Sequence, residues 1–355
     1  MRVVLFLVLA CAFGLGCGSD EAPGGRPGGA AGMFHNPGAG TGAGGAAATG
    51  AAASGAAGMI GACGGDVYAA VNKPLDIYVM MDESLSMILP VDLWTPTSSA
   101  LNQFFSSPDT AGIGVGIAFF SGGCDIAAYQ TPVVAVGDLP GNAMPLQDAL
   151  ASRFPGPGTA TEPAVRGAIA FAQQRATEHP DRKQVVLLVT DGEPANCGAT
   201  VESTATAAAE GLAGTPSIPT YVLGLGNISG LNQMAMAGGT GEAFVVDDPM
   251  QVQAVVEAMN AIRGLALPCE YRVPAPSMGA FNKDLVNLNW TLNGSTTTVP
   301  FVGDASGCDR APMGWHYDDA NAPSQLIACP STCAAFKSSG GDVSVALGCP
   351  QVLVE

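Results

Sequence analysis

Residues 75–86 of the chain have the sequence LDIYVMMDESLS. The first part of this stretch, Leu75 to Met81, is apolar except for Asp76, which is the pattern of a strand buried on both faces of a parallel sheet. The polar run that follows, Asp82-Glu83-Ser84-Leu85-Ser86, lies where this strand should end. We therefore expect an α/β fold with carboxylate and hydroxyl side chains at one edge of its sheet.

Three more apolar segments repeat this pattern, and helical segments separate them. The expected strands are 113–120, 184–190 and 220–224; the expected helices are 163–178, 201–211 and a last helix capped by Asp248-Pro249. This alternation predicts a doubly wound, mostly parallel sheet covered by helices on both sides. Residues 129–136 follow their predecessor too closely for a crossover helix, so we expect them to form an antiparallel edge strand.

Differences in amino-acid composition indicate three regions from residue 18 onward. Residues 18–62 are rich in Gly, Ala, Ser and Pro and offer too little apolar surface to bury, which predicts a flexible tether. Residues 63–269 are expected to form the α/β domain. Residues 270–355 contain short apolar segments between Pro, Gly and Asp turns and predict a small, disulfide-stapled, β-rich module. Its expected strands are 271–273, 285–292, 296–302, 324–327 and 343–346.

The N-terminus has the features of an export signal. Arg2 precedes an apolar run that is too short for a membrane span. Leu15-Gly16-Cys17 resembles the end of a bacterial lipoprotein signal, although Gly14 stands where a large aliphatic residue is usual. The alternatives are lipidation at Cys11 and an ordinary secretory signal cleaved nearby. We favour residues 1–17 as the signal, with Cys17 lipidated and the protein anchored at the outer membrane or cell surface, because the tether begins directly after Cys17.

The cysteines indicate disulfides. Of the 10 cysteines, Cys11 and Cys17 fall in the signal, and the even number that remains predicts four bridges in an exported chain. These are Cys63, Cys124, Cys197, Cys269, Cys308, Cys329, Cys333 and Cys349. Cys63 to Cys269 would join the two ends of the α/β domain, and Cys124 and Cys197 both follow parallel strands. The other four would pair among themselves, in any of three ways.

The overall charge argues against nucleic-acid binding. The formal net charge is −17, and the 13 basic residues are scattered along the chain. Such a chain repels a phosphate backbone unless it has a basic patch, and the sequence contains none.

Three polar segments are expected at the carboxyl edge of the parallel sheet, where open sheets of this kind bind ligands. Asp82-Glu83-Ser84-Leu85-Ser86 follows the first strand, and Thr190-Asp191-Gly192 ends a later one. Gly158-Thr159-Ala160-Thr161 lies in a loop that enters a helix. Their carboxylate and hydroxyl oxygens are hard ligands, which suit Mg²⁺ or Ca²⁺ better than Zn²⁺.

These segments resemble the metal-ion-dependent adhesion site of von Willebrand factor type A and integrin inserted domains, over about residues 72–265. The resemblance implies direct coordination by the two serines and the threonine, aspartates that act partly through water, and a partner carboxylate that completes the octahedron. Leu85 stands where the family often has Gly. Thr161 is expected to be the N-cap of the following helix rather than a ligand. The implied metal ligands are Asp82, Ser84, Ser86, Thr159 and Asp191.

The resulting hypothesis is a surface protein that binds a protein or glycan with an acidic group through Mg²⁺, or Ca²⁺ or Mn²⁺, and that is not an enzyme. One alternative is an envelope scaffold with a vestigial metal site. A second is an envelope hydrolase, which is disfavoured because none of His35, His179 and His316 accompanies a nucleophile turn. The phosphate-loop and dinucleotide-binding motifs are also missing from the sequence.

Overall fold

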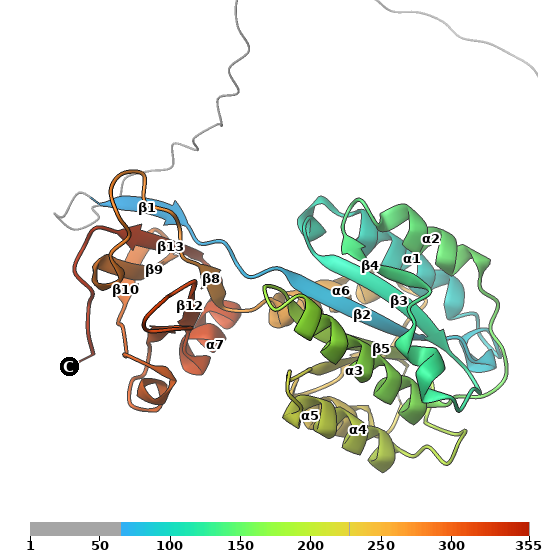
Figure 1. Ribbon diagram of the computed structural model, residues 1–355. Helices are drawn as coiled ribbons and strands as arrows, with labels where there is room; N and C mark the ends of the chain where they lie inside the picture. The colour runs from blue at the N-terminus through green and yellow to red at the C-terminus, as the bar shows by residue number, and fades with distance from the viewer. Residues whose placement is uncertain (1–64, 227, 355) are drawn as a thin grey trace, which may run out of the picture. The chain divides into compact units, whose positions relative to one another are not determined.

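The computed structural model describes residues 65–226 and 228–354, and Figure 1 shows the arrangement of their elements. Its largest sheet has six strands in the order β4-β3-β2-β5-β6-β7. The bounds are β2 (Leu75–Asp82), β3 (Gly114–Phe120), β4 (Val134–Asp138), β5 (Lys183–Thr190), β6 (Thr220–Leu225) and β7 (Phe244–Val246). All neighbours pair in parallel except β4, which is antiparallel to β3. The predicted mostly parallel α/β sheet with one antiparallel edge strand is confirmed.

Helices cover both faces of this sheet because alternate residues of the central strands point to opposite sides. On β2, Val79 and Met81 belong to one core and Tyr78 and Met80 to the other, and all four are buried. Figure 1 shows α3, α4 and α5 on one side of the sheet and α1 and α2 on the other; α6 packs into the same core as α1 and α2. The bounds are α1 (Trp94–Ser106), α2 (Ala143–Ser152), α3 (Thr161–Glu178), α4 (Val201–Ala213), α5 (Leu231–Ala237) and α6 (Val252–Ala266).

Two local expectations differ from the structure. Residues Ile126–Gln130 form a 3-10 helix, so the edge strand begins only at Val134. The last helix of the α/β domain, α6, has Gln251 as its N-cap residue, so the expected Asp248-Pro249 cap is wrong. The chain makes a turn first, in which the Asp248 carboxylate accepts a 2.7 Å hydrogen bond from the Gln251 side chain. Helices α1, α2 and α5 and strand β7 were not predicted.

The C-terminal region is β-rich, as expected. It contains a four-stranded sheet in the order β1-β13-β9-β10, in which β1 is Asp66–Ala69, and a three-stranded sheet in the order β11-β12-β8. Around them lie one helix and a buried core that includes Trp315, Leu288 and Leu326. The bounds are β8 (Glu270–Arg272), β9 (Val286–Leu292), β10 (Ser295–Val299), β11 (Trp315–Tyr317), β12 (Gln325–Ala328), α7 (Pro330–Ser339) and β13 (Asp342–Leu347). Strand β11 and helix α7 were not predicted.

Strand β1 (Asp66–Ala69) belongs to the C-terminal sheet, although it precedes the α/β domain in the sequence. It pairs antiparallel with β13, with Val67 opposite Ala346. The ring of Tyr68 packs against the C-terminal core. The expected division into 63–269 and 270–355 therefore assigns β1 to the wrong domain. Strands that are distant in sequence can be neighbours in one sheet, so the position of β1 before the α/β domain does not decide which sheet it joins.

The disulfides agree only partly with the expected scheme. Cys124–Cys197 is present as predicted. The Cys63–Cys269 bridge is wrong, because Cys269 directly precedes β8 and pairs with Cys333 on α7. The expectation that Cys308, Cys329, Cys333 and Cys349 pair among themselves is also wrong, because Cys333 pairs with Cys269. Cys308 pairs with Cys329, and Cys349 is also disulfide-bonded.

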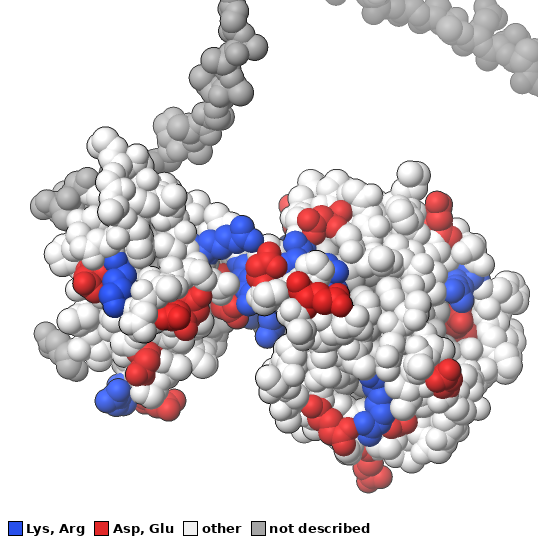
Figure 2. Space-filling model, in the orientation of Figure 1, with Lys and Arg blue, Asp and Glu red and all other residues white. Residues whose placement is uncertain are grey.

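Residues 1–64 lie outside the described part of the chain, and they include Cys63, the expected signal with Cys17, and the expected tether at 18–62. Among the residues that are described, no helix is long and apolar enough to cross a membrane. Charged side chains are sparse on the face shown in Figure 2, in keeping with a composition of 12% charged residues.

A buried ion network closes the amino-terminal end of β2. Asp76 is fully buried, and its carboxylate accepts hydrogen bonds from Arg175 Nε (2.8 Å), Arg182 Nε (2.7 Å) and Gln184 Nε2 (2.9 Å). A Cβ atom on Gly114 of β3 would lie 2.0 Å from Asp76 Oδ1, so only glycine fits beside this carboxylate. Asp76, at the start of β2, thus has a structural role that is separate from the opposite edge of the sheet, where Asp82 ends the same strand.

Candidate metal centre

The first segment of the candidate site is the turn that follows β2. Asp82 is fully buried, and its Oδ1 accepts a 2.8 Å hydrogen bond from the backbone N–H of Ser84. A short 3-10 helix, Leu85–Met87, then turns the chain so that the hydroxyl oxygens of Ser84 and Ser86 lie 2.8 Å apart. The alternating Asp-x-Ser-x-Ser spacing therefore places three oxygen-bearing side chains on one side of the turn.

The second segment, after β5, meets the first because β2 and β5 are parallel neighbours with Met81 opposite Val189. The next residue on β5, Thr190, donates a 2.6 Å hydrogen bond from its hydroxyl to Asp82 Oδ2. The Ser86 hydroxyl donates a 2.8 Å hydrogen bond to Asp191 Oδ1. Side-chain and backbone hydrogen bonds thus connect four of the five predicted residues.

Thr159, the fifth predicted residue, is held close to the others by the loop after β5. Its N–H donates a 2.8 Å hydrogen bond to Asn196 Oδ1, and its carbonyl accepts from the Ala195 N–H at 3.0 Å. A Cβ atom on Gly192 would lie 3.8 Å from Ser86 Oγ and 4.0 Å from Thr159 Oγ1. The structure therefore places the hydroxyls of Thr159 and Ser86 against the same glycine, beside Asp191.

The expected helix cap at Thr161 is wrong. The N-cap residue of α3 is Ala160, and Thr161 is the first residue of the helix. The Thr161 hydroxyl is buried and donates a long, 3.5 Å hydrogen bond to the carbonyl of Thr159. The cap is one residue earlier than expected because the carbonyl of Ala160 already accepts the first helical hydrogen bond, from the Ala164 N–H.

Among the described residues, no basic side chain forms an ion pair with either carboxylate. Burial raises the pKa of Asp82 from 3.8 to about 6 and also raises the pKa of Asp191 above its ordinary value. The ion pairs of the described residues include neither group; the basic residue of the adjoining loop, Arg153, pairs instead with Glu83 at 3.6 Å. A charge that is removed from water and has no partner is costly, so the buried Asp82 and the half-buried Asp191 together favour a cation.

The donor set fits a hard divalent cation. The side chains offer two carboxylates and three hydroxyls, which are the oxygen ligands that Mg²⁺ and Ca²⁺ prefer. The described residues contain no group of three or more His, Cys, Asp or Glu side chains placed to hold a metal ion. Any cation at this edge of the sheet therefore depends on the hydroxyls, and the residues that would hold it are Asp82, Ser84, Ser86, Thr159 and Asp191.

Three supporting features were not predicted as parts of the site. The sequence places Thr190 in the segment Thr190-Asp191-Gly192 but does not indicate that it bonds to Asp82. No sequence pattern singles out Asn196. Gly158 has a φ of +94°, and a Cβ atom there would lie 2.6 Å from Gly122 Cα and 2.8 Å from Asn196 Oδ1. The Cys124–Cys197 bridge ties together the loops that carry Gly122 and Asn196, so it fixes the backbone on both sides of Thr159.

The histidines that the structure describes lie in other surroundings. His179 is the residue at which α3 ends, and His316 is on β11, where its Nδ1 lies 2.8 Å from the carbonyl oxygen of Tyr317. His35 lies outside the described residues. Neither described histidine makes a hydrogen bond to a serine or threonine hydroxyl in the described part of the chain.

The family model of the von Willebrand factor type A domain matches residues 76–258, which is more than half of the 355 residues. The chain belongs to the von Willebrand factor type A family. All five residues of the candidate site fall within the matched region of this von Willebrand factor type A domain. A comparison with curated proteins finds no match.

Several solved structures are similar to the chain. Proximal thread matrix protein 1 from the mussel byssus, in a form with a zinc-occupied MIDAS motif, is 16% identical over 58% of this chain and 50% of its own, with a TM-score of 0.43. The pilus adhesin SpaC from Lactobacillus rhamnosus GG, in its open conformation, is 15% identical over 78% of this chain and 38% of its own, with a TM-score of 0.42. A von Willebrand factor type A protein from Catenulispora acidiphila is 12% identical over 81% and 61%, with a TM-score of 0.41. The match spans about half the length of the mussel protein.

Proposed function

We propose that this von Willebrand factor type A domain binds a protein or glycan partner through a divalent cation held by Asp82, Ser84, Ser86, Thr159 and Asp191. The observation that carries the proposal is the convergence of these oxygens, from three separate segments, around the buried Asp82 and the half-buried Asp191, neither of which pairs with a basic side chain among the described residues. Mg²⁺ is the first choice, with Ca²⁺ and Mn²⁺ as alternatives, because all the donors are oxygens.

Five residues would hold the cation, and two others position them. The Ser84, Ser86 and Thr159 hydroxyls supply neutral oxygens, and Asp82 and Asp191 supply the negative charge. Thr190 and Asn196 orient Asp82 and Thr159 through the hydrogen bonds at 2.6 Å and 2.8 Å. A bound ion with few charged ligands retains affinity for one more acidic oxygen, which is the chemistry that a partner's carboxylate would use.

Binding is the simpler function for this site than catalysis. The serine hydroxyls contact each other and Asp191, and neither described histidine is positioned to accept a proton from them. A Ser-His-Asp hydrolase needs a histidine within hydrogen-bond reach of its nucleophilic serine. We therefore propose that the protein is a binding protein, exported and held at the outer membrane or cell surface through Cys17.

Isothermal titration with MgCl₂, CaCl₂ and MnCl₂ tests the proposal on the full chain. The wild type should bind one cation, and Asp191→Ala should lose this binding while its circular dichroism spectrum remains unchanged, because Asp191 lies beyond the end of β5. Asp148→Ala is the matched control, since Asp148 is an exposed carboxylate on α2. A wild type that binds none of the three cations, or an Asp191→Ala variant that binds as well as Asp148→Ala, contradicts the proposal. A pull-down from cell-surface extract with and without chelator then identifies the partner.

A further inference from the structure

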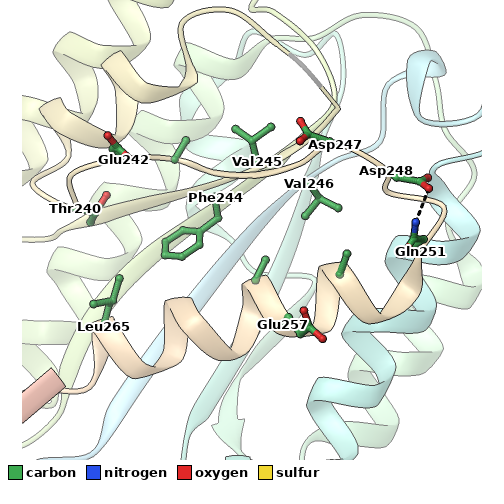
Figure 3. A pocket seen from close by; sticks show the side chains of 13 residues that line it. Thr240, Glu242, Phe244, Val245, Val246, Asp247, Asp248, Gln251, Glu257 and Leu265 are labelled. Atoms are coloured by element: carbon green, nitrogen blue, oxygen red, sulfur yellow. Dashed lines mark hydrogen bonds between the residues drawn. The ribbon is translucent and has the colours of Figure 1, made fainter. Parts of the chain in front are cut away.

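A groove runs along the open edge of the main sheet, between its last strand β7 and helix α6. It encloses about 720 Å³. Figure 3 shows the two elements side by side, with Phe244 and Val246 pointing toward α6 and Val245 and Asp247 pointing away from it. Because β7 is the terminal strand in the order β4-β3-β2-β5-β6-β7, only one of its two edges is paired within the sheet.

The backbone of β7 presents hydrogen-bonding groups to this groove. Val246 is paired with Leu225, and its carbonyl accepts a 2.9 Å hydrogen bond from the Gly226 N–H. In a parallel ladder the N–H and C=O of one residue face the same neighbour and those of the next residue face the other side. The N–H and C=O of Val245 therefore point away from β6, where an added strand can pair with them.

The floor of the groove is apolar. Helix α6 buries Val255, Met259 and Ile262 in the core and turns the small residues Ala254 and Ala258 toward the groove. Small side chains on this face leave space between the helix and the strand. Phe244 and Leu265 complete the apolar surface, and 42% of Leu265 is exposed. Apolar side chains of a bound segment could pack against this apolar surface.

The rim of the groove is acidic. Its charged lining residues are Glu242, Asp247, Asp248 and Glu257, and the lining contains no Lys or Arg. The ion pairs of the described chain include none of the four carboxylates. Two of the four accept hydrogen bonds from amides: Gln251 donates to Asp248 and Gln253 to Glu257. The charge of the rim is thus left for a cationic ligand.

We propose that β7 and α6 bind an extended peptide segment of a partner protein that carries Lys or Arg side chains alternating with apolar ones. Its backbone would pair with Val245 as an added strand, its apolar side chains would contact Phe244 and the alanines of α6, and its cations would face the acidic rim. From Gln251 to Leu265 the helix rises about 21 Å, which is the length of about six residues of extended chain.

Charge selects this occupant over two others. Residues 1–64 of the same chain contain only two basic residues, Arg2 and Arg26, so they offer little to the four carboxylates. A second copy would bring the same acidic rim and a formal net charge of −17 against the first. A basic segment of another protein gains from both the rim and the overall charge.

Fluorescence anisotropy with a labelled, end-blocked peptide of sequence TKVRVKT tests this on the full chain in EDTA. The wild type should bind the peptide. The Asp247→Lys/Glu257→Lys variant should lose affinity by a factor of about ten or more, and Val245→Pro should not bind. Val245→Pro should still fold, because the N–H that it removes takes no part in pairing with β6. Asp148→Lys is the control for charge and should bind as the wild type does.

Two altered peptides separate strand pairing from charge alone. Peptide TEVEVET, and TKVRVKT with N-methylated valines, should both fail to bind. The proposal is overturned if TKVRVKT does not bind, if the N-methylated peptide binds equally well, or if the charge-reversed variant binds as the wild type does. It is also overturned if the free protein is a dimer and the peptide dissociates that dimer. The Asp191→Ala variant should bind the peptide normally in EDTA, so failure of the metal-site proposal leaves this result unaffected.

Discussion

The hydroxyl of Ser86 donates a 2.8 Å hydrogen bond to Asp191 across 105 residues of sequence. The bond exists because β2 and β5 are adjacent parallel strands that end at the same edge of the sheet. It connects the two segments that carry most of the candidate metal ligands. The geometry of the site therefore depends on contacts between loops as much as on individual side chains.

Thr159 and Thr161 should behave differently when each is replaced by alanine. Thr159→Ala removes an oxygen from the candidate site but leaves its N–H bonded to Asn196, so cation affinity should fall while the melting temperature stays close to that of the wild type. Thr161→Ala removes a buried hydroxyl with one long hydrogen bond, at 3.5 Å, so cation affinity should be retained. Calorimetric titration of both variants measures this, and equal affinities for the two would show that Thr159 is not a ligand.

The metal-free protein should become more stable as the pH falls from 7 toward 4. The pKa of Asp82 is about 6 in the folded state and 3.8 ordinarily, so the folded state binds a proton more tightly than the unfolded state does. Ionised Asp82 therefore destabilises the fold above pH 6, by at most about 3 kcal/mol. The stabilisation appears as the pH falls through 6 and is complete below the ordinary pKa. The raised pKa of Asp191 acts in the same direction.

Urea denaturation in EDTA across this pH range measures the effect of Asp82. Asp82→Asn should make the free energy of unfolding much less dependent on pH, and should raise it at pH 7. An Asp82→Asn variant that keeps the full pH dependence of the wild type would contradict the assignment of the raised pKa to Asp82.

Replacing Asp76 should destabilise the fold without affecting the metal site. Asp76→Ala leaves Arg175 and Arg182 without their buried carboxylate, and breaking such a pair costs about 3–5 kcal/mol. Asp138→Ala is the comparison, because Asp138 pairs with the same Arg182 from a side chain that is 59% exposed and should contribute less than about 1 kcal/mol. Urea denaturation distinguishes the two, and similar losses in both variants would show that the network is not important for stability.

The Cys124–Cys197 bridge should support cation binding. Cys197 follows Asn196, whose side chain accepts the hydrogen bond from Thr159, so the Cys124→Ser/Cys197→Ser variant should bind Mg²⁺ more weakly. The Cys308→Ser/Cys329→Ser variant also removes a bridge, but one in the C-terminal region, and its affinity for Mg²⁺ should be unchanged. If both double variants bind Mg²⁺ as the wild type does, the bridge has no role in positioning Thr159.

Lipid attachment at Cys17 gives a cellular prediction. The wild-type protein should partition into the detergent phase, because the several acyl chains of a lipoprotein bind membranes firmly whereas a single chain binds only marginally. Cys17→Ala should appear in the aqueous phase or be mislocalised. Mass spectrometry of the mature N-terminus provides the check, and an unmodified wild-type protein found wholly in the medium would rule out the anchor.

Sequence patterns alone predict the central strands, three of the helices that cover them (α3, α4 and α6) and the five oxygen-bearing residues proposed as metal ligands. Segment 75–86 could be interpreted alone because burial on both faces requires an unbroken apolar run, and the parallel arrangement brings the strand ends to one edge. Short elements such as α5 and β7 were not predicted, because so few residues show no clear hydrophobic periodicity.

Several contacts between distant segments became known only from the tertiary structure. It showed that β1 pairs with β13, that Cys269 bonds to Cys333 rather than to Cys63, and that Asn196 holds Thr159. It also showed that β7 has an unpaired edge with an acidic rim beside it. Local sequence patterns report periodicity and burial, whereas pairing between distant segments is selected by the packing of the whole chain, and that selection leaves no local trace.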